Sequence, residues 1–223
     1  MRIGLYGAGL MALDMVDFAL SGCLDYWDCD SWVRIREPEF LVYDDRSDAP
    51  KNSELSSLQG AEMRFVDTLD VLNRADIIIN CVAKTSRIRE IISKKLRKFS
   101  AMQPPIKHSA SLVSKSALIG FGSVIYPFAN VGAHARVGKY VIVQNYSVVA
   151  HQCRVGDSSI LAPSVLLGGK SQIGSEVFLC SKVFVYPGRN IGDFCMVDVG
   201  LNVKTDLEAG YLLTARGKTK FRL

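Results

Sequence analysis

Residues 118–169 read LIGFGSVIYPFANVGAHARVGKYVIVQNYSVVAHQCRVGDSSILAPSVLLGG, and an aliphatic residue recurs at every sixth position of this stretch. The same period continues on both sides, and its members are all Val, Ile or Leu: Val113, Ile119, Ile125, Val131, Val137, Val143, Val149, Val155, Leu161, Leu167, Ile173, Leu179, Val185, Ile191, Val197 and Val203. Small residues usually stand two positions earlier: Ser111, Ala117, Ser123, Ala129, Ala135, Ser147, Cys153, Ser159 and Ser171. Glycine often follows directly: Gly120, Gly132, Gly138, Gly156, Gly168, Gly174 and Gly192.

A period of six excludes an α-helix as the source of this pattern. In a helix the apolar positions would rotate around the axis instead of forming one stripe. A chain wound into a triangular prism explains it, because each face adds one large aliphatic side chain and one small residue to a narrow interior. Glycine then lets the chain turn each corner without a Cβ clash. Three faces form one coil, so residues 113–203 predict a parallel β-helix of about five coils, stacked roughly 4.8 Å apart.

The residues in front of the repeat have the pattern of a small α/β domain. RIGLYG at 2–7 is a buried strand, and GAGLMA at 7–12 has the spacing of a turn that cradles phosphate on a helix amino terminus. Further strands are expected at 39–43, 63–66 and 76–82, with helices near 10–20, 68–74 and 84–99. We therefore predict a Rossmann-like domain over 1–105 and a β-helix over 106–223, with residues 21–38 as an insertion.

A complete dinucleotide fold is disfavoured. Such a fold places an acidic residue about twenty positions past its glycines. Asp44 and Asp45 end the second predicted strand, but they lie much later. The domain is also only half the size of a dinucleotide fold.

The charge is unevenly distributed between the two predicted domains. Residues 1–105 contain 14 Lys/Arg and 16 Asp/Glu, whereas residues 106–223 contain 13 and 6, so the net charges are −2 and +7. The second half suits an anionic ligand. Nucleic acid is disfavoured because the basic residues are scattered, with few aromatic residues between them. A phosphate-rich cofactor fits better. The basic residues near the end of the chain either contribute to binding the anionic ligand or form a solvated tail: Arg216, Lys218, Lys220 and Arg222.

Composition also limits the compartment and the cofactors. The six cysteines show no CxxC pair and no Cys/His cluster at zinc spacing, so neither a disulfide framework nor a structural metal is expected. The amino terminus has no signal-peptide pattern, and no apolar run is long enough to span a membrane. We expect a cytoplasmic protein.

The repeat at 118–169 resembles the hexapeptide-repeat acyltransferases, in particular the sialic acid O-acetyltransferase and bacillosamine N-acetyltransferase group. The resemblance implies a left-handed coil, a homotrimer, acetyl-CoA as co-substrate and a nucleotide-activated sugar as acceptor. It implies that the front domain holds the nucleotide through Gly7, Ala8, Gly9, Asp44 and Asp45. It also implies that coenzyme A is held by Gly168, Gly169, Cys180, Ser181, Val199 and Lys204.

Acetyl transfer needs a base for the nucleophile's proton and a donor for the oxyanion that forms. Histidine suits the first role near neutral pH, and the chain has only His108, His134 and His151. His108 opens the repeat and is expected to cap it. His151 lies two residues after the core residue Val149, so it should point outward near a corner. The resemblance matches it to the family's catalytic histidine.

Gly169 falls one coil after His151, roughly 4.8 Å above it. Its N–H is a candidate oxyanion donor, and the resemblance implies the same role. Gln152 stands where the family commonly has an acidic residue that orients the ring. His134 falls one coil below Gln152, so either a relay through the Gln152 amide or an incidental outward histidine accounts for it.

Other positions depart from the family pattern. Gln144 replaces an asparagine seven residues before the histidine, and Cys180 and Asp198 stand where glycine is usual. The glycine turn continues with Leu10 and Met11 instead of Gly-His or Gly-Asn, and TARGKTK replaces the terminal Asn-Pro-Ala turn.

The sequence predicts acetyl transfer from acetyl-CoA to the amino group of a nucleotide-linked sugar, with His151 as base. O-acetylation of a sialic-acid-like sugar and a catalytically silent β-helix module are the alternatives. A zinc enzyme on a β-helix is disfavoured, because the three histidines include no plausible ligand pair within one hexad.

Overall fold

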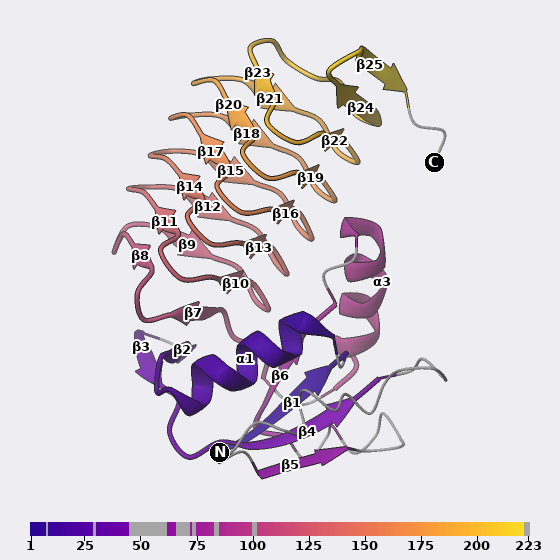
Figure 1. Cartoon of the computed structure of the whole chain (residues 1–223). Coiled ribbons are helices and arrows are strands. Elements are labelled where there is room, and N and C mark those ends of the chain that lie inside the picture. Colours follow the sequence, from indigo (N-terminus) through magenta and orange to yellow (C-terminus); the bar gives the residue numbers. More distant parts are fainter. Residues whose placement is uncertain are drawn as a thin grey trace.

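The chain forms a prism of short parallel strands beside a small α/β sheet (Figure 1). The computed structural model describes residues 1–7, 9–28, 30–44, 62–65, 72, 75–82, 85–99 and 102–220. The predicted β-helix is confirmed, because the segment from residue 106 onward winds through three parallel sheets.

The α/β part is a four-stranded parallel sheet in the order β5-β4-β1-β6. Its elements are β1 (Arg2–Tyr6), α1 (Leu10–Leu20), β4 (Glu39–Tyr43), β5 (Glu62–Phe65), β6 (Ile77–Asn80) and α3 (Ser86–Leu96). All of them match the ranges predicted from sequence to within three residues at each end. The helix expected at 68–74 falls largely outside the described residues.

The coils of the prism contribute short strands to three faces, each strand two residues long except β7. The first face contains β7 (Ile106–His108), β10 (Val124–Ile125), β13 (Ile142–Val143), β16 (Ile160–Leu161), β19 (Phe178–Leu179) and β22 (Met196–Val197). The second contains β8 (Leu112–Val113), β11 (Asn130–Val131), β14 (Val148–Val149), β17 (Leu166–Leu167), β20 (Phe184–Val185) and β23 (Asn202–Val203). The third contains β9 (Leu118–Ile119), β12 (Arg136–Val137), β15 (Arg154–Val155), β18 (Gln172–Ile173) and β21 (Asn190–Ile191). Strand partners are eighteen residues apart, as in the pair Val149 and Leu167.

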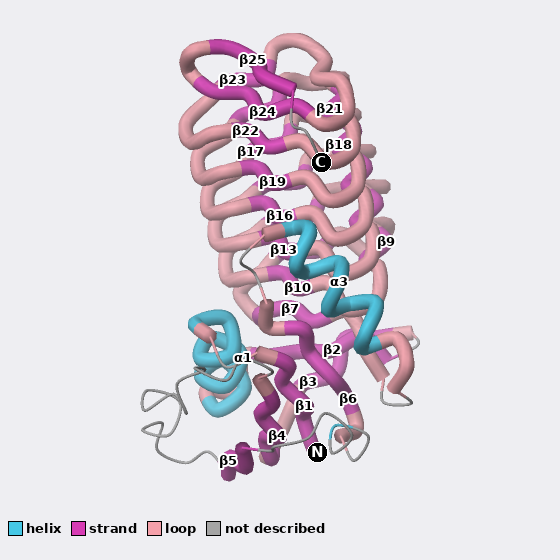
Figure 2. Tube along the Cα trace, turned by 90° about the vertical axis from the view of Figure 1, so that its right-hand side faces the viewer, coloured by secondary structure: helices cyan, strands magenta, loops and turns pink. Residues whose placement is uncertain are grey.

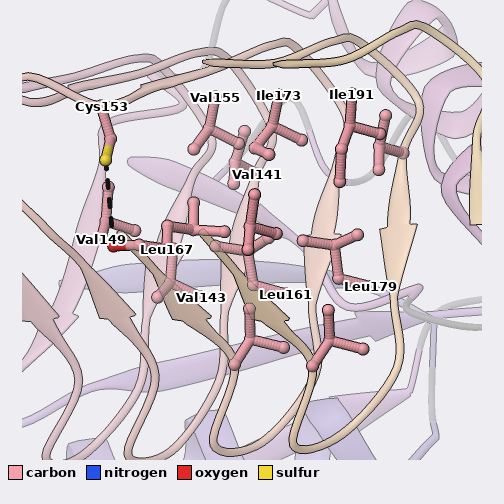
Figure 3. Packing of buried hydrophobic residues seen from close by; sticks show 14 of the residues in the cluster. Val141, Val143, Val149, Cys153, Val155, Leu161, Leu167, Ile173, Leu179 and Ile191 are labelled. Atoms are coloured by element: carbon pink, nitrogen blue, oxygen red, sulfur yellow. Dashed lines mark hydrogen bonds between the residues drawn. The ribbon is translucent and has the colours of Figure 1, made fainter. Parts of the chain in front are cut away.

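The aliphatic residues of the repeat fill the interior of the prism (Figure 3). From Ile125 to Val203 every one of them is buried, with at most 4% of its surface exposed. The small residues beside them are buried too, and the serines among them join successive coils. Ser147 Oγ donates to Ala162 O at 2.9 Å and accepts from Val165 N at 3.1 Å. These hydrogen bonds explain why serine is so frequent at an interior position.

The corners are built differently from the sequence-based expectation. The left-handed conformation falls on the second corner residue, which is usually not glycine: Phe128, His134, Tyr140, Tyr146, Gln152, Ser158, Ser164, Lys170, Glu176, Lys182 and Phe194. The glycines that follow the aliphatic residues are needed because successive coils approach closely. A Cβ on Gly156 would lie 2.5 Å from Gly174 C and Ser175 N. The predicted clash is therefore real, but it is with the next coil.

The insertion predicted at 21–38 is a β-hairpin that extends the prism. Its strands β2 (Leu24–Asp28) and β3 (Ser31–Arg34) pair with each other, and β2 pairs with β7 antiparallel. The hairpin covers the open first coil and leaves a cavity of about 450 Å³ beside Trp27, Trp32 and Ile119. At the other end, β24 (Tyr211–Thr214) and β25 (Gly217–Lys220) complete the ten-stranded sheet of the first face.

The α/β part and the prism share one core. Outward residues of the first face, Val124, Ile142 and Ile160, are buried against a cluster that includes Met11 and Met15 of α1. In the part of the chain that the structure describes, no helix has the length and apolar character needed to cross a membrane.

Candidate active site

The corner between the second and third faces, which we call the second–third corner, brings His151 and Gly169 together. The strands that flank them, β14 and β17, pair in register. A Cβ built on Gly169 would lie 2.5 Å from His151 Nε2 and 2.6 Å from Cε1. The imidazole therefore lies over the bare Cα of Gly169, at the place a side chain would occupy. The predicted vertical alignment of these two residues is confirmed.

This corner holds an exposed imidazole beside the peptide N–H of a glycine. The backbone is fixed there, because Lys170 N donates to His151 O at 3.0 Å. A ring nitrogen can accept a proton, and an amide can donate to an oxygen that becomes negatively charged. The arrangement suits addition of a nucleophile to a carbonyl group.

Beside His151, the column of left-handed corner residues contains Gln152 in the same coil and His134 one coil below. Their φ angles are 58° and 57°. Gln152 N donates to Ala133 O at 2.9 Å, and His134 N donates to Ser116 Oγ at 3.1 Å. Among the described residues, no hydrogen bond joins the side chains of His134, Gln152 and His151. The relay is not formed in this structure.

His108 lies away from this corner, as expected for a capping residue. Its Nδ1 accepts from Ala110 N at 3.0 Å, and its ring meets Phe18 edge-on with centroids 4.7 Å apart. Burial lowers the pKa of the imidazole, so the neutral ring that accepts this hydrogen bond is favoured.

The residues predicted to hold coenzyme A surround the second face. Gly168 and Gly169 lie at the second–third corner, whereas Cys180, Ser181 and Val199 lie at the corner between the first and second faces. Position 168 needs glycine for a structural reason as well, because the next coil lies so close that a Cβ there would be 2.6 Å from Pro187 N.

Lys204, which follows β23, places its Nζ 5.8 Å from the centroid of the Tyr186 ring. Tyr186 is stacked on Phe184 with centroids 4.6 Å apart. Tyr186 was not among the residues predicted from the sequence, although it lies one coil above Gly168 and one coil below Lys204. A search at a period of eighteen would have found it.

The glycine turn lies between β1 and α1. Gly7 has φ +98°, and its N donates to Tyr43 O at 2.7 Å, so this position needs glycine. Gly9 caps α1 with φ −86°, and a Cβ added to it meets no atom within 4 Å. Asp44 follows β4 directly and is half-buried. The predicted nucleotide residues Ala8 and Asp45 lie outside the described residues.

The structure separates the glycine turn from His151. α1 packs on the first face, where Tyr126 Oη donates to Asp14 Oδ2 at 3.1 Å. The amino terminus of α3 packs at the corner between the third and first faces, where Ser86 Oγ donates to Val177 O at 3.1 Å. Both helices lie beside the strands of the first face in Figure 2. His151 is at the second–third corner, opposite that face.

Within the described ranges, no group of three or more His, Cys, Asp or Glu side chains is placed to hold a metal ion.

No family model matches the sequence. Over 75 residues the chain is 27% identical to GDP-perosamine N-acetyltransferase of Escherichia coli O157:H7, a match that covers 34% of this chain and 34% of that enzyme. The match therefore spans about a third of the length of the curated relative.

Solved structures match over almost the whole chain. The acetyltransferase domain of PglB from Neisseria gonorrhoeae FA1090, in complex with acetyl coenzyme A, has a TM-score of 0.79 and 22% identity, covering 99% of this chain and 98% of that one. PerB from Caulobacter crescentus, in complex with CoA and GDP-perosamine, has a TM-score of 0.78 and 21% identity, covering 100% and 98%. WeeI from Acinetobacter baumannii AYE has a TM-score of 0.64 and 20% identity, covering 99% and 100%. The chain has the fold of these proteins and is similar to the hexapeptide-repeat sugar N-acetyltransferases, as its sequence predicted.

Proposed function

We propose that this protein transfers the acetyl group of acetyl-CoA to the amino group of a nucleotide-linked amino sugar. The observation that carries the proposal is the imidazole of His151 lying over the bare Cα of Gly169, with a backbone amide beside it. The comparisons favour nitrogen over oxygen as the acceptor, because the curated relative is named an N-acetyltransferase and PerB was crystallised with an amino-sugar nucleotide.

In the proposed reaction the sugar amine attacks the thioester carbonyl, and His151 accepts one amine proton. A C–N bond forms, and the carbonyl oxygen becomes an anion that accepts from Gly169 N–H. The C–S bond then breaks, its electron pair goes to sulfur, and the proton on His151 passes to the thiolate. The products are an acetamido sugar and free CoA. A histidine-to-alanine variant of the Caulobacter enzyme was crystallised with CoA and GDP-perosamine, so that enzyme binds both ligands without this histidine.

Coenzyme A is proposed to run upward along the second face, past Gly168 and Gly169. Lys204 lies three coils above the level of His151, which is roughly 14 Å at the usual strand spacing. An extended pantetheine arm spans a comparable distance, which supports the proposal that Lys204 contacts the pyrophosphate. Cys180, Ser181 and Val199 would line the opposite corner of the same face.

The nucleotide is proposed to bind at the glycine turn, with its phosphates at the amino terminus of α1. The strand order β5-β4-β1-β6 is that of one half of a Rossmann-like fold. The open space at the Gly9 Cβ leaves the backbone accessible to a phosphate, and Asp44 is the acidic group at the adjacent strand end.

A homotrimer with left-handed coils is proposed as the working assembly. The glycine turn faces the first face of the prism, whereas His151 projects from the opposite corner, so one copy cannot bring both to one sugar. Apolar side chains remain exposed along the second face and its corners: Leu112, Phe128, Tyr146, Leu166, Tyr186 and Val199. Phe128 and Tyr146 are stacked 5.1 Å apart. Burying this surface against a second copy would bring a partner's nucleotide to His151.

The decisive experiment is a reaction of the purified protein with acetyl-CoA and a panel of GDP- and UDP-linked 4-amino sugars. Mass spectrometry is expected to find one added acetyl group per sugar, with one equivalent of free CoA thiol released. Matched sugars with a hydroxyl in place of the amine are the control. If only the hydroxyl sugars are acetylated, the protein is an O-acetyltransferase. If calorimetry detects no binding of acetyl-CoA, the prism is a catalytically silent binding module.

A further inference from the structure

We propose that Lys170 is a catalytic residue that stabilises the negative charge on the thioester during acetyl transfer. The inference rests on the proposed function. It adds a residue that neither the sequence motif nor the comparisons assign.

Lys170 directly follows Gly169, whose amide is the proposed oxyanion donor. Consecutive Cα atoms are about 3.8 Å apart, so the side chain of Lys170 begins close to the Gly169 amide. The position is fixed, because Lys170 adopts the left-handed corner conformation with φ +63° and its N donates to His151 O at 3.0 Å.

The side chain of Lys170 is available to a substrate. It is exposed, and within the described residues it forms no ion pair. One coil above it the corner residue is Gly188, where an added Cβ would meet no atom within 4 Å. No side chain at position 188 therefore covers Lys170 from the next coil. Asp206, a carboxylate higher on the same corner, is engaged by Asn190 at 3.1 Å and Arg189 at 3.6 Å.

The charge of Lys170 matches the charge that the reaction creates. Attack places a full negative charge on the carbonyl oxygen, and cleavage of the C–S bond moves it to sulfur. Gly169 supplies one neutral donor, whereas an ammonium group stabilises both anions in turn. The residue one coil below Lys170 is Gln152, which is uncharged. Asp206, two coils above, is the carboxylate of this column among the described residues, and it pairs with Asn190 and Arg189 instead. The corner therefore presents a cation where the thioester would lie.

Lys182 offers a matched control for substitution of Lys170. It is also an exposed lysine in the left-handed corner conformation, with φ +61°, but it lies at the first–second corner. Lys170→Met and Lys182→Met therefore remove the same charge from the same backbone geometry. Equal melting temperatures for both variants and the wild type establish that the fold is intact.

We expect Lys170→Met to lower kcat by about 10²-fold, the effect of losing one oxyanion donor, while KM for acetyl-CoA stays within about two-fold. Lys170→Arg should recover most of the rate, and Lys182→Met should react like the wild type. The same loss is expected with acetyl-pantetheine, which has no nucleotide phosphates. If Lys170→Met lowers kcat with acetyl-CoA but not with acetyl-pantetheine, Lys170 binds the phosphates and the proposal is overturned. An unchanged kcat with acetyl-CoA would overturn it as well.

A second measurement does not depend on turnover. Ultraviolet difference absorbance reports the thiolate fraction of bound CoA, and that fraction should be higher in the wild type than in Lys170→Met at the same pH. Equal fractions would overturn the role of Lys170 even if acetyl transfer is confirmed. If the wild type binds no CoA in calorimetry, the proposed function itself is contradicted. Failure of the Lys170 proposal is thereby distinguished from failure of the proposed function.

Discussion

At the scale of single residues, the candidate site depends on one side chain occupying the space left by another. The His151 imidazole lies where the Cβ of residue 169 would be. The missing side chain of Gly169 therefore leaves its amide exposed and makes room for the ring. Any larger residue at 169 must displace the imidazole or distort the coil. The base and the oxyanion donor are therefore a single structural unit.

Replacing His151 by alanine is expected to reduce kcat for acetyl transfer by about 10²- to 10⁴-fold, the range for a lost general base. Steady-state kinetics with acetyl-CoA and the amino-sugar nucleotide give the measurement. His134→Ala is the control, since His134 makes no side-chain hydrogen bond to Gln152 or His151. Full activity in His151→Ala would remove this residue from the mechanism, and an equal loss in both variants would restore the relay.

Asp14 predicts a pH effect on stability. Burial raises the pKa of this carboxyl above its ordinary 3.8, and the hydrogen bond from Tyr126 only partly offsets it. The folded state then holds the proton more tightly than the unfolded state, so stability falls as pH rises from 3.8 through the raised pKa. Asp14→Asn should therefore have a higher Tm than the wild type at pH 7, with the gap closing below pH 3.8.

The measurement is thermal unfolding across that pH range. Asp28→Asn, an exposed change of the same type, serves as the comparison. A wild type that is as stable as Asp14→Asn at pH 7 would show that the half-buried carboxylate costs the fold nothing.

At the scale of elements, the coil is held by backbone spacing as well as by its aliphatic interior. Gly156 and its equivalents stand where one coil meets the next, and their φ angles are not in the left-handed region. Serines such as Ser147 bond to the following coil from inside. Each hexad must therefore meet three separate requirements: it fills the interior, it forms hydrogen bonds inside the prism, and it allows successive coils to approach closely.

Gly156→Ala should destabilise the protein by about 1–3 kcal/mol or more, because its Cβ would overlap the Gly174–Ser175 peptide. The midpoint of chemical denaturation measures the change. Ser175→Ala, at the adjoining corner, is expected to stay within about 0.5 kcal/mol. Equal midpoints for the two variants would mean that the coils separate freely to admit a methyl group.

At the scale of the whole molecule, the two halves of the proposed site face opposite sides of the prism. The α/β part is joined rigidly to the first face through a shared core. The buried Arg89 reinforces the junction, donating to Tyr140 O at 2.5 Å and to Asn80 O at 2.8 Å. Hinge motion within one copy cannot bring the glycine turn to His151 without breaking these contacts.

Mixed assemblies are therefore expected to recover activity from two inactive variants. Gly9→Glu places a carboxylate where the phosphates would bind, in space where a Cβ meets no neighbour, and His151→Ala removes the base. Co-expressed and purified together through two tags, they should form sites with an intact glycine turn from one copy and an intact His151 from another. Activity no higher than that of either parent would place the whole site within one copy.

The sequence alone determined the prism and the stacking of Gly169 over His151, because the narrow interior sets a strict period of six and fixes which residues lie one coil apart. It also determined those strands and helices of the α/β part that the structure describes. It did not reveal that the hairpin of β2 and β3 pairs with β7 through β2, that Phe, His, Gln and Lys adopt left-handed corners, or that the glycine turn and His151 face apart. Those features were decided by the tertiary structure, since a local repeat says nothing about which open strand edge a distant hairpin will cover or which face a neighbouring core will bury. The unfavourable φ of a corner residue is offset by the hydrogen bond that its N–H donates to the coil below, as from Gln152 to Ala133 O or from His134 to Ser116 Oγ.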